Sequence, residues 1–352
     1  MKPMKITIAD VARKAGVSAG TVDRVLHGRG EVSATSAEKV RRAVSELNFK
    51  PNIFASMLAT RQACVLAVLL PKFTDGSYWE KIYNGYLAGA AQLSSLDVRL
   101  NFFFFDQDDV LSFRSACSEA LQSSPSGVAL SPVFKNEALV FADTLFKQRI
   151  PYVYVDTKVE DPNYFSFFGM PMYQSGYLSA VLLTERCTAE DLKSVALVGI
   201  KRNKNRQSDP TIVRREGFTD YMERHYPSCE LLKVDIDADD PEKTCEILDE
   251  FASRHPGVRQ MVMFNSRVHL LGPWLRKNPM NGRRVIGYDG LDRNIELLKR
   301  SLVDALISQK IDDQASRAVS VLANYIILQR KPESRDNYLH MDILTRFNIE
   351  NY

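Results

Sequence analysis

The chain has few of the residues and motifs from which catalytic, metal or disulfide sites are built. It holds five cysteines, an odd number with no close pair, and five histidines that lack HExxH or related spacing. This pattern predicts buried, reduced thiols and neither a disulfide framework nor a metal site. We also find no Walker loop, no dinucleotide-binding glycine motif after a strand and no Ser-His-Asp arrangement. The sequence therefore favours a protein that is not an enzyme and carries no cofactor.

The chain also lacks an apolar run of the length that a membrane span requires. Its N-terminus leads directly into a capped helix, and not into the apolar stretch of a signal peptide. We therefore expect a cytoplasmic protein. A length of 352 residues is more than one small core accommodates, so we expect two or more globular units.

The first residues carry the pattern of two short helices around a tight turn. Thr7 and Asp10 fit a capping box at the start of a helix, and Gly16 fits the left-handed residue that ends it. Ser18 then caps a second helix. Two helices that cross around a glycine turn predict a helix-turn-helix, whose second helix enters the major groove. The outward N-terminal side of that helix carries Ala19, Gly20, Thr21 and Arg24.

The charge of this segment agrees with DNA binding. Up to Arg61 there are 11 Lys and Arg against 5 Asp and Glu, whereas the whole chain has 46 against 43. The head is therefore positive and the remainder is mildly acidic. A positive head attached to an acidic body suits binding to phosphate.

A third helix and a short apolar segment follow. Ser33 caps the third helix, Asn48 ends it, and Pro51-Asn52 breaks the chain. The segment 53–59 is apolar nearly all round and too short to be stable alone. It needs a partner, which is either a second copy of itself or the floor of a DNA groove. The alternative is a linker helix that packs on the body of the protein.

These residues resemble the lac-repressor family of transcriptional regulators. The resemblance implies that residues 19–26 form the recognition helix and that segment 53–59 is a hinge helix, folding only as a pair in the minor groove. Leu58 would then be an apolar wedge that opens the central base step of a palindromic operator. Hydroxyl groups at Ser18, Thr21, Ser33 and Ser36 would hold phosphates. The resemblance is carried by Asp10-Val11-Ala12, Ala15-Gly16-Val17-Ser18, Thr21-Val22, Arg24-Val25, Val32-Ser33, Glu46-Leu47-Asn48, Pro51-Asn52, Ala55, Leu58 and Ala59.

Departures from the family leave the operator sequence open. Ala19 and Gly20 replace side chains that often bond base edges, so Arg24 remains as a base reader or a phosphate contact. His27, at the end of the same helix, contacts phosphate or caps the helix. The candidate DNA-binding residues are Thr7, Ser18, Ala19, Gly20, Thr21, Arg24, His27, Ser33, Ser36, Asn52, Ala55 and Leu58.

From residue 63 onward, apolar runs of strand length alternate with helical patterns. This alternation predicts an α/β body of doubly wound parallel sheets, with helices on both faces. We expect the run Phe102-Phe103-Phe104-Phe105 to lie in the core, because continuous apolarity indicates a strand covered on both faces. The predicted strands are 65–70, 98–105, 128–130, 152–155, 195–198, 261–264 and 285–288. The predicted helices are 79–94, 110–122, 137–147, 212–224 and 242–254.

Parallel sheets bind ligands beyond the carboxyl ends of their strands. Several polar and aromatic residues follow the predicted strands. Two further polar residues of the body, Arg214 and Gln309, join this set of candidates. Carboxylates and amides can bind sugar hydroxyls, and an aromatic ring can cover the apolar face of a sugar. We therefore expect an effector site for a sugar, sugar acid or sugar phosphate. Its candidate residues are Tyr78, Trp79, Ser131, Asp156, Arg214, Asn265, Asp289 and Gln309.

The body also resembles the periplasmic-binding-protein type I domain that follows the head in this family. The resemblance implies a head at 1–50, a hinge at 51–62, and an effector and dimerisation domain at 63–352. It implies two subdomains, 63–168 plus 307–331 and 169–306 plus 332–352, with a cleft and three crossing strands. Arg214, Asn265, Asp289 and Gln309 match ligand-facing positions. Ser266 and Arg267 replace the acidic and neutral residues common in the family and make the cleft more basic.

The loop 201–206 is also basic. If it lines the cleft, it favours an acidic sugar or sugar phosphate over a neutral sugar; otherwise it is a solvated surface loop. The tail from Pro332 lacks a leucine heptad, so we expect a dimer and not a tetramer.

The sequence as a whole predicts a repressor of carbohydrate-use genes. An effector would close the cleft, move the paired subdomains and make the hinge helices form or melt. One alternative is a sugar receptor without DNA function, which would show a signal peptide and no basic head. A second is an enzyme on an α/β scaffold. A third keeps the regulator and replaces the sugar with a purine or partner-protein corepressor.

Overall fold

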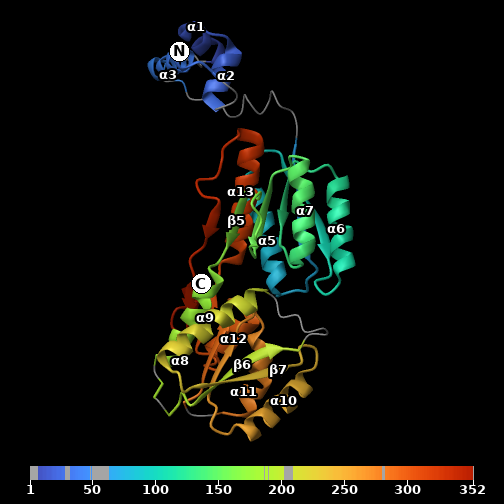
Figure 1. Ribbon diagram of the computed structural model, residues 1–352, viewed down its shortest axis with the longest axis vertical. Coiled ribbons are helices and arrows are strands. Elements are labelled where there is room, and N and C mark those ends of the chain that lie inside the picture. The colour runs from blue at the N-terminus through green and yellow to red at the C-terminus, as the bar shows by residue number, and fades with distance from the viewer. Residues whose placement is uncertain are drawn as a thin grey trace.

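The computed structural model describes residues 7–27, 32–47, 49, 63–185, 187–188, 190–201, 209–279 and 282–351. A small helical head precedes two α/β lobes that lie one beyond the other along the long axis (Figure 1). This arrangement confirms the predicted fold class. The predicted hinge segment lies outside the described residues.

The head is built from three helices around an apolar core. Thr7 and Asp10 form the predicted capping box, and Gly16 adopts the left-handed conformation at φ 66°. Ser33 caps the third helix through the Ser36 amide, and that helix ends at Glu46. Asn48, its predicted stop, lies outside the described residues. The helices are α1 (Ile8–Ala15), α2 (Ala19–His27) and α3 (Ala34–Glu46).

The first lobe is a six-stranded, fully parallel sheet in the order β11-β5-β4-β3-β1-β2. Helices α5 and α13 pack on one face, and α6 and α7 cover the other. The strands are β1 (Cys64–Pro71), β2 (Val98–Phe105), β3 (Gly127–Leu130), β4 (Tyr152–Asp156), β5 (Ser166–Gly169) and β11 (Asp336–Tyr338). The helices are α5 (Tyr78–Gln92), α6 (Val110–Gln122), α7 (Lys135–Lys147) and α13 (Ile311–Leu328).

The second lobe repeats this plan in the order β12-β10-β9-β8-β6-β7, with β12 antiparallel to β10. Helices α8 and α9 cover one face, and α10, α11 and α12 lie on the other. The strands are β6 (Ser194–Ile200), β7 (Glu230–Ile236), β8 (Gln260–Met263), β9 (Arg284–Tyr288), β10 (Ala305–Ser308) and β12 (Asp342–Leu344). The helices are α8 (Met172–Thr184), α9 (Asp209–His225), α10 (Pro241–Arg254), η1 (Val268–Leu271), α11 (Gly272–Lys277), α12 (Asp292–Lys299) and η2 (Ile349–Asn351).

The chain crosses between the lobes after β5, after β10 and after β11. The expected subdomain boundaries, roughly 307 and 332, differ from these crossings by a few residues. Ile307 pairs with Tyr288 in the second sheet, and Asp336 pairs with Phe167 in the first. Both strands are three or four residues long, so sheet pairing defines them, and local hydrophobicity does not.

The seven predicted strands and five predicted helices are all present, with ends that shift by at most three residues. The expectation for the phenylalanine run is wrong in part. Phe105 is fully buried, but Phe104 is 41% exposed because β2 is the edge strand of its sheet. One side of an edge strand has no neighbour to cover it.

Candidate functional site

Residues at the carboxyl ends of the two sheets meet where the two lobes face each other, and we call this region the cleft. Asp156 is the last residue of β4 in the first lobe, and Asp289 follows β9 in the second. Both carboxylates lie within Coulombic range of the Arg214 guanidinium. Predicted effector residues from three distant chain segments therefore meet at one place.

The first-lobe wall of the cleft is organised around Asp156. The Tyr78 hydroxyl donates a hydrogen bond to its carboxylate from the start of α5, and the Thr157 hydroxyl donates a second at 2.9 Å. Ser131 follows β3 and is 1% exposed, and its strand neighbours β4 in the sheet. Two carboxylate bonds from the same lobe fix the orientation of Asp156.

The second-lobe wall is organised around Arg214, which projects from α9. Its Nη1 donates to the Phe264 carbonyl oxygen at 2.7 Å, and its guanidinium carbon lies 4.2 Å from the centre of the Tyr288 ring. Asp289 accepts from the Gln309 amide at 3.0 Å. Arg214, Asp289 and Gln309 are each at most 4% exposed. These groups are therefore held rigidly and out of bulk water.

Two glycines allow α9 to approach α8 closely enough to place Arg214 in this wall. A Cβ atom built on Gly176 would lie 1.8 Å from the Arg214 carbonyl oxygen, and one on Gly217 would lie 2.0 Å from the Tyr173 carbonyl oxygen. No side chain fits at either contact. The position of Arg214 thus depends on the absence of side chains at the helix crossing.

Burial changes the acid–base properties of the cleft residues. Burial raises the pKa of Asp289 to about 6, although the Arg214 charge and the Gln309 hydrogen bond oppose the shift. Burial also raises the pKa of Asp156, against the hydrogen bonds from Tyr78 and Thr157 and the charge of Arg214. Burial next to two carboxylates raises the pKa of Tyr78 well above its usual value, so Tyr78 remains a hydrogen-bond donor. Clusters of shifted groups in a cleft are typical of functional sites.

Several buried polar atoms at the cleft have no hydrogen-bond partner within the described chain. They are Arg214 Nε, Gln309 Oε1, Ser131 Oγ and Ser77 Oγ. An unmet buried donor or acceptor costs about 1–3 kcal/mol. A ligand that offers both donors and acceptors would recover this cost.

Two other predicted residues have different local roles. The Asn265 side-chain oxygen accepts from the Arg267 backbone amide at 2.9 Å and caps the turn after β8. Trp79 packs edge-on against Tyr78, with ring centres 5.1 Å apart, and both rings border the core of the first lobe.

Lys81 was not a predicted site residue, but it reaches the cleft. Its ammonium donates to the Gly290 carbonyl oxygen at 2.5 Å, across the two lobes. It lies one helical turn after Tyr78 on α5, a spacing that places both residues on one helix face. That spacing was the only feature of the sequence that could have placed Lys81 at the cleft.

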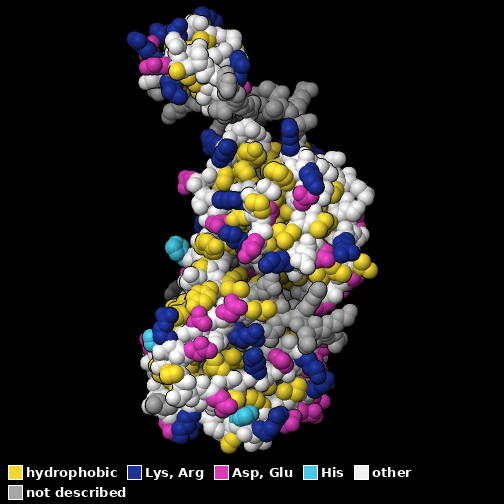
Figure 2. All heavy atoms as spheres, in the orientation of Figure 1, with side chains coloured by type: hydrophobic (Ala, Val, Ile, Leu, Met, Phe, Trp, Pro, Cys, Tyr) yellow, Lys and Arg dark blue, Asp and Glu magenta, His cyan; other side chains and the backbone are white. Residues whose placement is uncertain are grey.

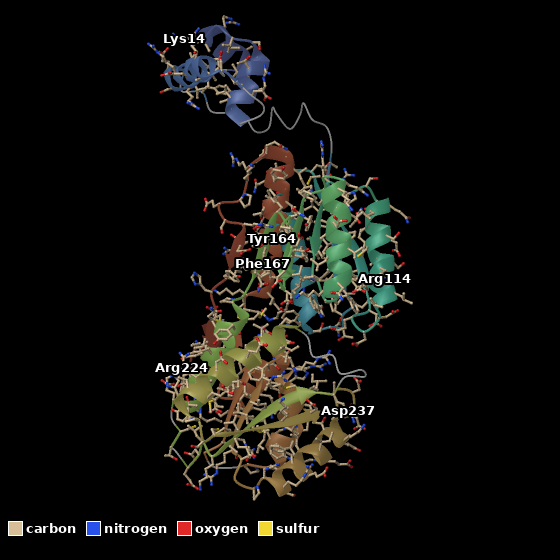
Figure 3. The ribbon with its side chains drawn as sticks, in the orientation of Figure 1. Lys14, Arg114, Tyr164, Phe167, Arg224 and Asp237 are labelled. Atoms are coloured by element: carbon tan, nitrogen blue, oxygen red, sulfur yellow. The ribbon has the colours of Figure 1, made fainter. Side chains whose placement is uncertain are left out.

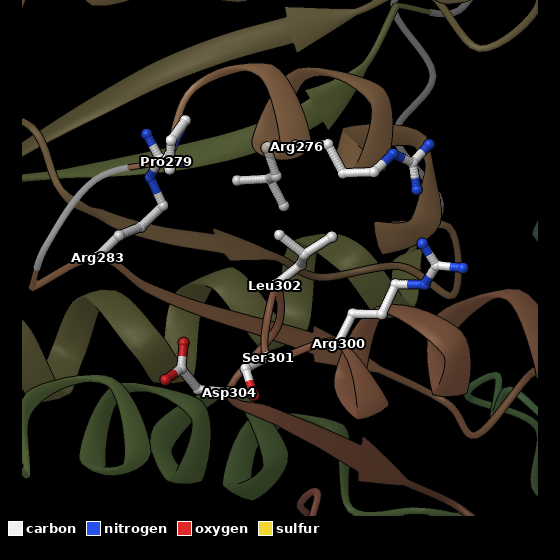
Figure 4. A pocket seen from close by; sticks show the side chains of 8 residues that line it. Arg276, Pro279, Arg283, Arg300, Ser301, Leu302 and Asp304 are labelled. Carbon is white, nitrogen blue, oxygen red and sulfur yellow. The ribbon is translucent and has the colours of Figure 1, made fainter.

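A separate pocket of about 430 Å³ lies in the second lobe beside α11 and the turn after α12 (Figure 4). Its lining contains three arginines, Arg276, Arg283 and Arg300, together with Asp304. It contains none of the predicted effector residues, and it lies at the amino ends of β9 and β10, opposite the cleft. It is therefore distinct from the cleft between the lobes.

Most of the described candidate DNA-binding residues lie at the N-terminal ends of the head helices, and Arg24 lies further along α2. Ser18 Oγ accepts from the Thr21 backbone amide at 3.1 Å and forms a hydrogen bond with the Thr21 hydroxyl at 2.9 Å. The Ser33 and Ser36 hydroxyls form a similar pair. Ala19, Gly20 and Arg24 are exposed on α2. Exposed helix N-termini offer amide donors to phosphate. The His27 side chain and residues Asn52, Ala55 and Leu58 lie outside the described residues.

The surface of the head carries many Lys and Arg side chains (Figure 2). Some are paired within the head: Lys14, labelled in Figure 3, lies 3.2 Å from Glu46, and Arg13 lies 3.3 Å from Asp10. Arg24 is anchored to its own helix, since its Nε donates to the Gly20 carbonyl oxygen at 3.2 Å. The Lys14–Glu46 pair thus links the C-terminal ends of α1 and α3, and the polar N-terminal ends of the head helices remain exposed.

Within the described ranges, none of the helices combines the length and hydrophobicity that a membrane span needs. In those same ranges, no three His, Cys, Asp or Glu side chains gather as a metal site would require.

Sequence profiles of known families match both parts of the chain. The profile of bacterial regulatory proteins of the lacI family matches residues 7–52, and that of the periplasmic binding protein domain matches residues 66–330. A crystal structure described as a LacI transcriptional regulator from Bacteroides fragilis is 30% identical. It aligns with 83% of this chain and 100% of its own, at a TM-score of 0.77.

A solute binding protein of a carbohydrate transporter from Agrobacterium radiobacter, solved with D-arabinose, shares the fold at 19% identity. It covers 83% of this chain and 97% of its own, at a TM-score of 0.70. The transcriptional regulator MalR of Streptococcus pneumoniae is 37% identical over 26% of this chain and 28% of its own length. Catabolite control protein A of Staphylococcus xylosus is 25% identical over 63% of each chain. Both matches span less than two thirds of these curated relatives.

The helical head and the two-lobed body thus define a class of protein, a DNA-binding-type head attached to a periplasmic-binding-protein fold. The chain belongs to the lacI family of bacterial regulatory proteins.

Proposed function

We propose that this protein is a cytoplasmic, sequence-specific DNA-binding transcriptional regulator that represses carbohydrate-use genes and is switched by a small sugar-like effector. One observation carries the proposal. A helix-turn-helix head is joined to a cleft in which Asp156, Arg214 and Asp289 converge with buried, unpartnered polar atoms. The head supplies an affinity for DNA, and the cleft supplies a site that a ligand would complete.

The head suits a palindromic operator. The hydroxyl groups of Ser18, Thr21, Ser33 and Ser36 lie at helix N-termini, where phosphate is favoured. Arg24 is the long basic side chain on the exposed face of α2 and would reach a base edge or a phosphate. The hinge segments at 51–62 of two copies of the chain would enter the minor groove together.

The charge balance of the cleft favours an uncharged, hydroxyl-rich effector. Asp156 and Asp289 carry two negative charges, and Arg214 and Lys81 carry two positive ones. An additional anion would meet two buried carboxylates, whose repulsion weakens binding at low dielectric. Hydroxyl groups both donate and accept, so they match Arg214 Nε and Gln309 Oε1 together. The loop at 201–206, whose charge would favour a sugar acid or sugar phosphate if it lined the cleft, lies outside the described residues after Lys201.

An exposed apolar face supports a homodimer. The rings of Phe102 and Phe104 stack along the edge strand β2 at 5.9 Å, and Tyr83 packs against them from α5. Leu87 on α5 and Phe104 are 42% and 41% exposed. An apolar edge strand favours association with a second copy. A dimer would also supply the second hinge segment.

The DNA-binding part is tested by selecting duplexes from a random pool with the full chain and measuring their affinity against salt concentration. We expect a palindromic consensus and a log–log slope that corresponds to several phosphates. A chain that begins at residue 63 should fold and bind no DNA. Retained binding by this shorter chain would place the DNA site in the body and refute the assignment of the head.

The effector part is tested by a thermal-shift screen of neutral sugars, their uronic acids, their phosphates and purines. Tight ligands raise the melting temperature by mass action. Each hit is then added to the complex of the protein with the selected operator. We expect a neutral sugar to stabilise the protein and release the operator. A purine that stabilises the protein and tightens operator binding would instead favour the corepressor alternative.

A further inference from the structure

Lys81 joins the two lobes through a side-chain bond, in addition to the three crossing segments of the backbone. It lies on α5 in the first lobe, and its Nζ donates to the Gly290 carbonyl oxygen of the second lobe at 2.5 Å. Lys81 is half-buried and Gly290 is buried. A charge-assisted bond between such groups is stronger than a neutral one.

The position of Lys81 within its helix is locally unfavourable. It is the fourth residue of α5, next to the first turn, where the helix dipole repels a cation. The Asp289 carboxylate on the opposite lobe compensates for this, because it attracts the Lys81 ammonium. The same attraction lowers the pKa of Asp289. Lys81 is therefore stabilised by groups that belong to the other lobe, and it loses them when the lobes separate.

The acceptor of Lys81 lies in a segment that its own lobe holds firmly. Asp289 has a left-handed backbone at φ 64°, and the Asn294 side-chain amide donates to the carbonyl oxygens of Tyr288 and Asp289 at 3.0 Å each. Gly290 follows directly. The turn 288–291 is thus fixed from the second lobe by Asn294 and contacted from the first lobe by Lys81.

We propose that Lys81 is a positioning residue that sets the closure of the cleft. It acts through Gly290 and Asp289, and it links the lobe that carries Tyr78 and Asp156 to the lobe that carries Arg214. The Lys81 bond joins the lobes through a side chain and not through the continuous backbone of a crossing segment, so it can break when the lobes separate while the crossing segments stay intact. The regulatory consequence rests on the proposed function: the strength of this bond would set the effector concentration at which the protein switches.

Hydrogen exchange of the ligand-free, full-length protein, followed by mass spectrometry, tests this inference. Lys81→Met removes the ammonium and keeps an unbranched chain. We expect amides around residues 78–86 and 288–294 to exchange about tenfold faster than in wild type, the scale of one lost charged hydrogen bond. Amides in the C-terminal halves of α7 and α10, which lead to the amino ends of β4 and β8, should exchange at wild-type rates.

Two further variants make the test decisive. Lys147→Met is the matched control. The Lys147 ammonium pairs with Asp143 of the same helix, α7, at 2.6 Å, and the Lys147 side chain is 73% exposed. We expect this variant to leave cleft exchange unchanged. Lys81→Arg keeps a cationic donor and should retain most of the protection. Small-angle scattering of Lys81→Met should show a larger radius of gyration than wild type.

Three results would overturn the inference: unchanged cleft exchange in Lys81→Met, faster exchange throughout both lobes, or equal losses in Lys81→Arg and Lys81→Met. The experiment uses neither DNA nor a sugar. Its failure would leave the proposed function intact, and failure of operator or sugar binding would leave this result standing.

Discussion

The Arg214 guanidinium carbon lies 4.2 Å from the centre of the Tyr288 ring, and its Nη1 bonds the Phe264 carbonyl oxygen at 2.7 Å. The ring and the carbonyl hold the guanidinium on two sides while Nε remains without a partner. If Arg214 binds the proposed effector, this fixed geometry would reduce the entropy lost on binding.

Arg214→Ala should abolish the response to the effector and retain operator binding. The variant removes a fixed donor from the cleft, and the head is a separate unit with its own core. Operator affinity should be measured for wild type and variant, with and without the sugar found by screening. An unchanged response at the same sugar concentration would place the pocket elsewhere. Loss of operator binding without sugar would show that Arg214 is structural.

Gly176→Ala should impair the effector site from a distance. Its Cβ would lie 1.8 Å from the Arg214 carbonyl oxygen, so α9 must shift and carry Arg214 with it. We expect destabilisation of about 1–3 kcal/mol, the scale of overpacking, and a weaker sugar response. Urea unfolding and a sugar titration measure the two effects. Gly257→Ala is the control, because no atom lies within 4 Å of its added Cβ.

Effector affinity should fall below pH 6. Burial raises the pKa of Asp289 from 3.8 to about 6, so its proton is bound below that pH in the ligand-free protein. A protonated carboxyl no longer accepts a hydroxyl hydrogen at both oxygens. If the ligand requires the carboxylate, each pH unit below 6 lowers the affinity by up to about tenfold. Calorimetric titrations between pH 5 and 8 check this, and an affinity that rises on acidification would contradict it.

The same pKa shift fixes the sign of the stability effect of Asp289. Its proton binds more tightly in the folded chain than in the unfolded one. Its contribution to the free energy of unfolding therefore decreases as the pH rises from about 4 to 6, and is constant above that range.

Gly16→Ala should destabilise the head. Gly16 has φ 66°, where an alanine is strained by about 1 kcal/mol, although no atom within 4 Å would contact its Cβ. Gly20→Ala is the matched control for folding, since Gly20 lies in α2 without positive φ and alanine favours a helix there. Hydrogen exchange of α1 and α2 amides should increase only in Gly16→Ala. Equal exchange in both variants would refute the left-handed turn.

Leu58→Ala should weaken specific DNA binding and spare non-specific binding. The family resemblance predicts that Leu58 wedges between bases, and unstacking one step involves a few kcal/mol. Affinities for the selected operator and for a scrambled duplex should be compared at one salt concentration. Equal losses on both duplexes would indicate a general defect of the head.

The sequence predicted most features that local chemistry determines. The caps at Thr7 and Ser33 and the left-handed Gly16 follow from side-chain bonds and steric limits within a few residues. The same holds for the buried strand β1, which is apolar throughout. Features that depend on distant partners were missed. Strands β11 and β12 have three residues each and exist through their pairing.

The cleft was predicted in part for the same reason. Asp156 and Asp289 were proposed because residues at the carboxyl ends of parallel strands share an edge of the sheet, and both lie near Arg214 in the structure. Lys81 was missed because a lysine on an amphipathic helix resembles a solvated residue in sequence. Only the approach of the second lobe shows that its ammonium meets Gly290.

The three crossings between the lobes also govern the order in which the protein can fold during synthesis. The sheet of the first lobe receives its last strand at residues 336–338, and that of the second at 342–344. At 5–20 residues per second, the ribosome releases the head roughly 15 to 60 seconds before either sheet is complete. Because the head has a core of its own, it can fold while the body is still unfinished, and a nascent chain would then meet DNA before it could sense a ligand.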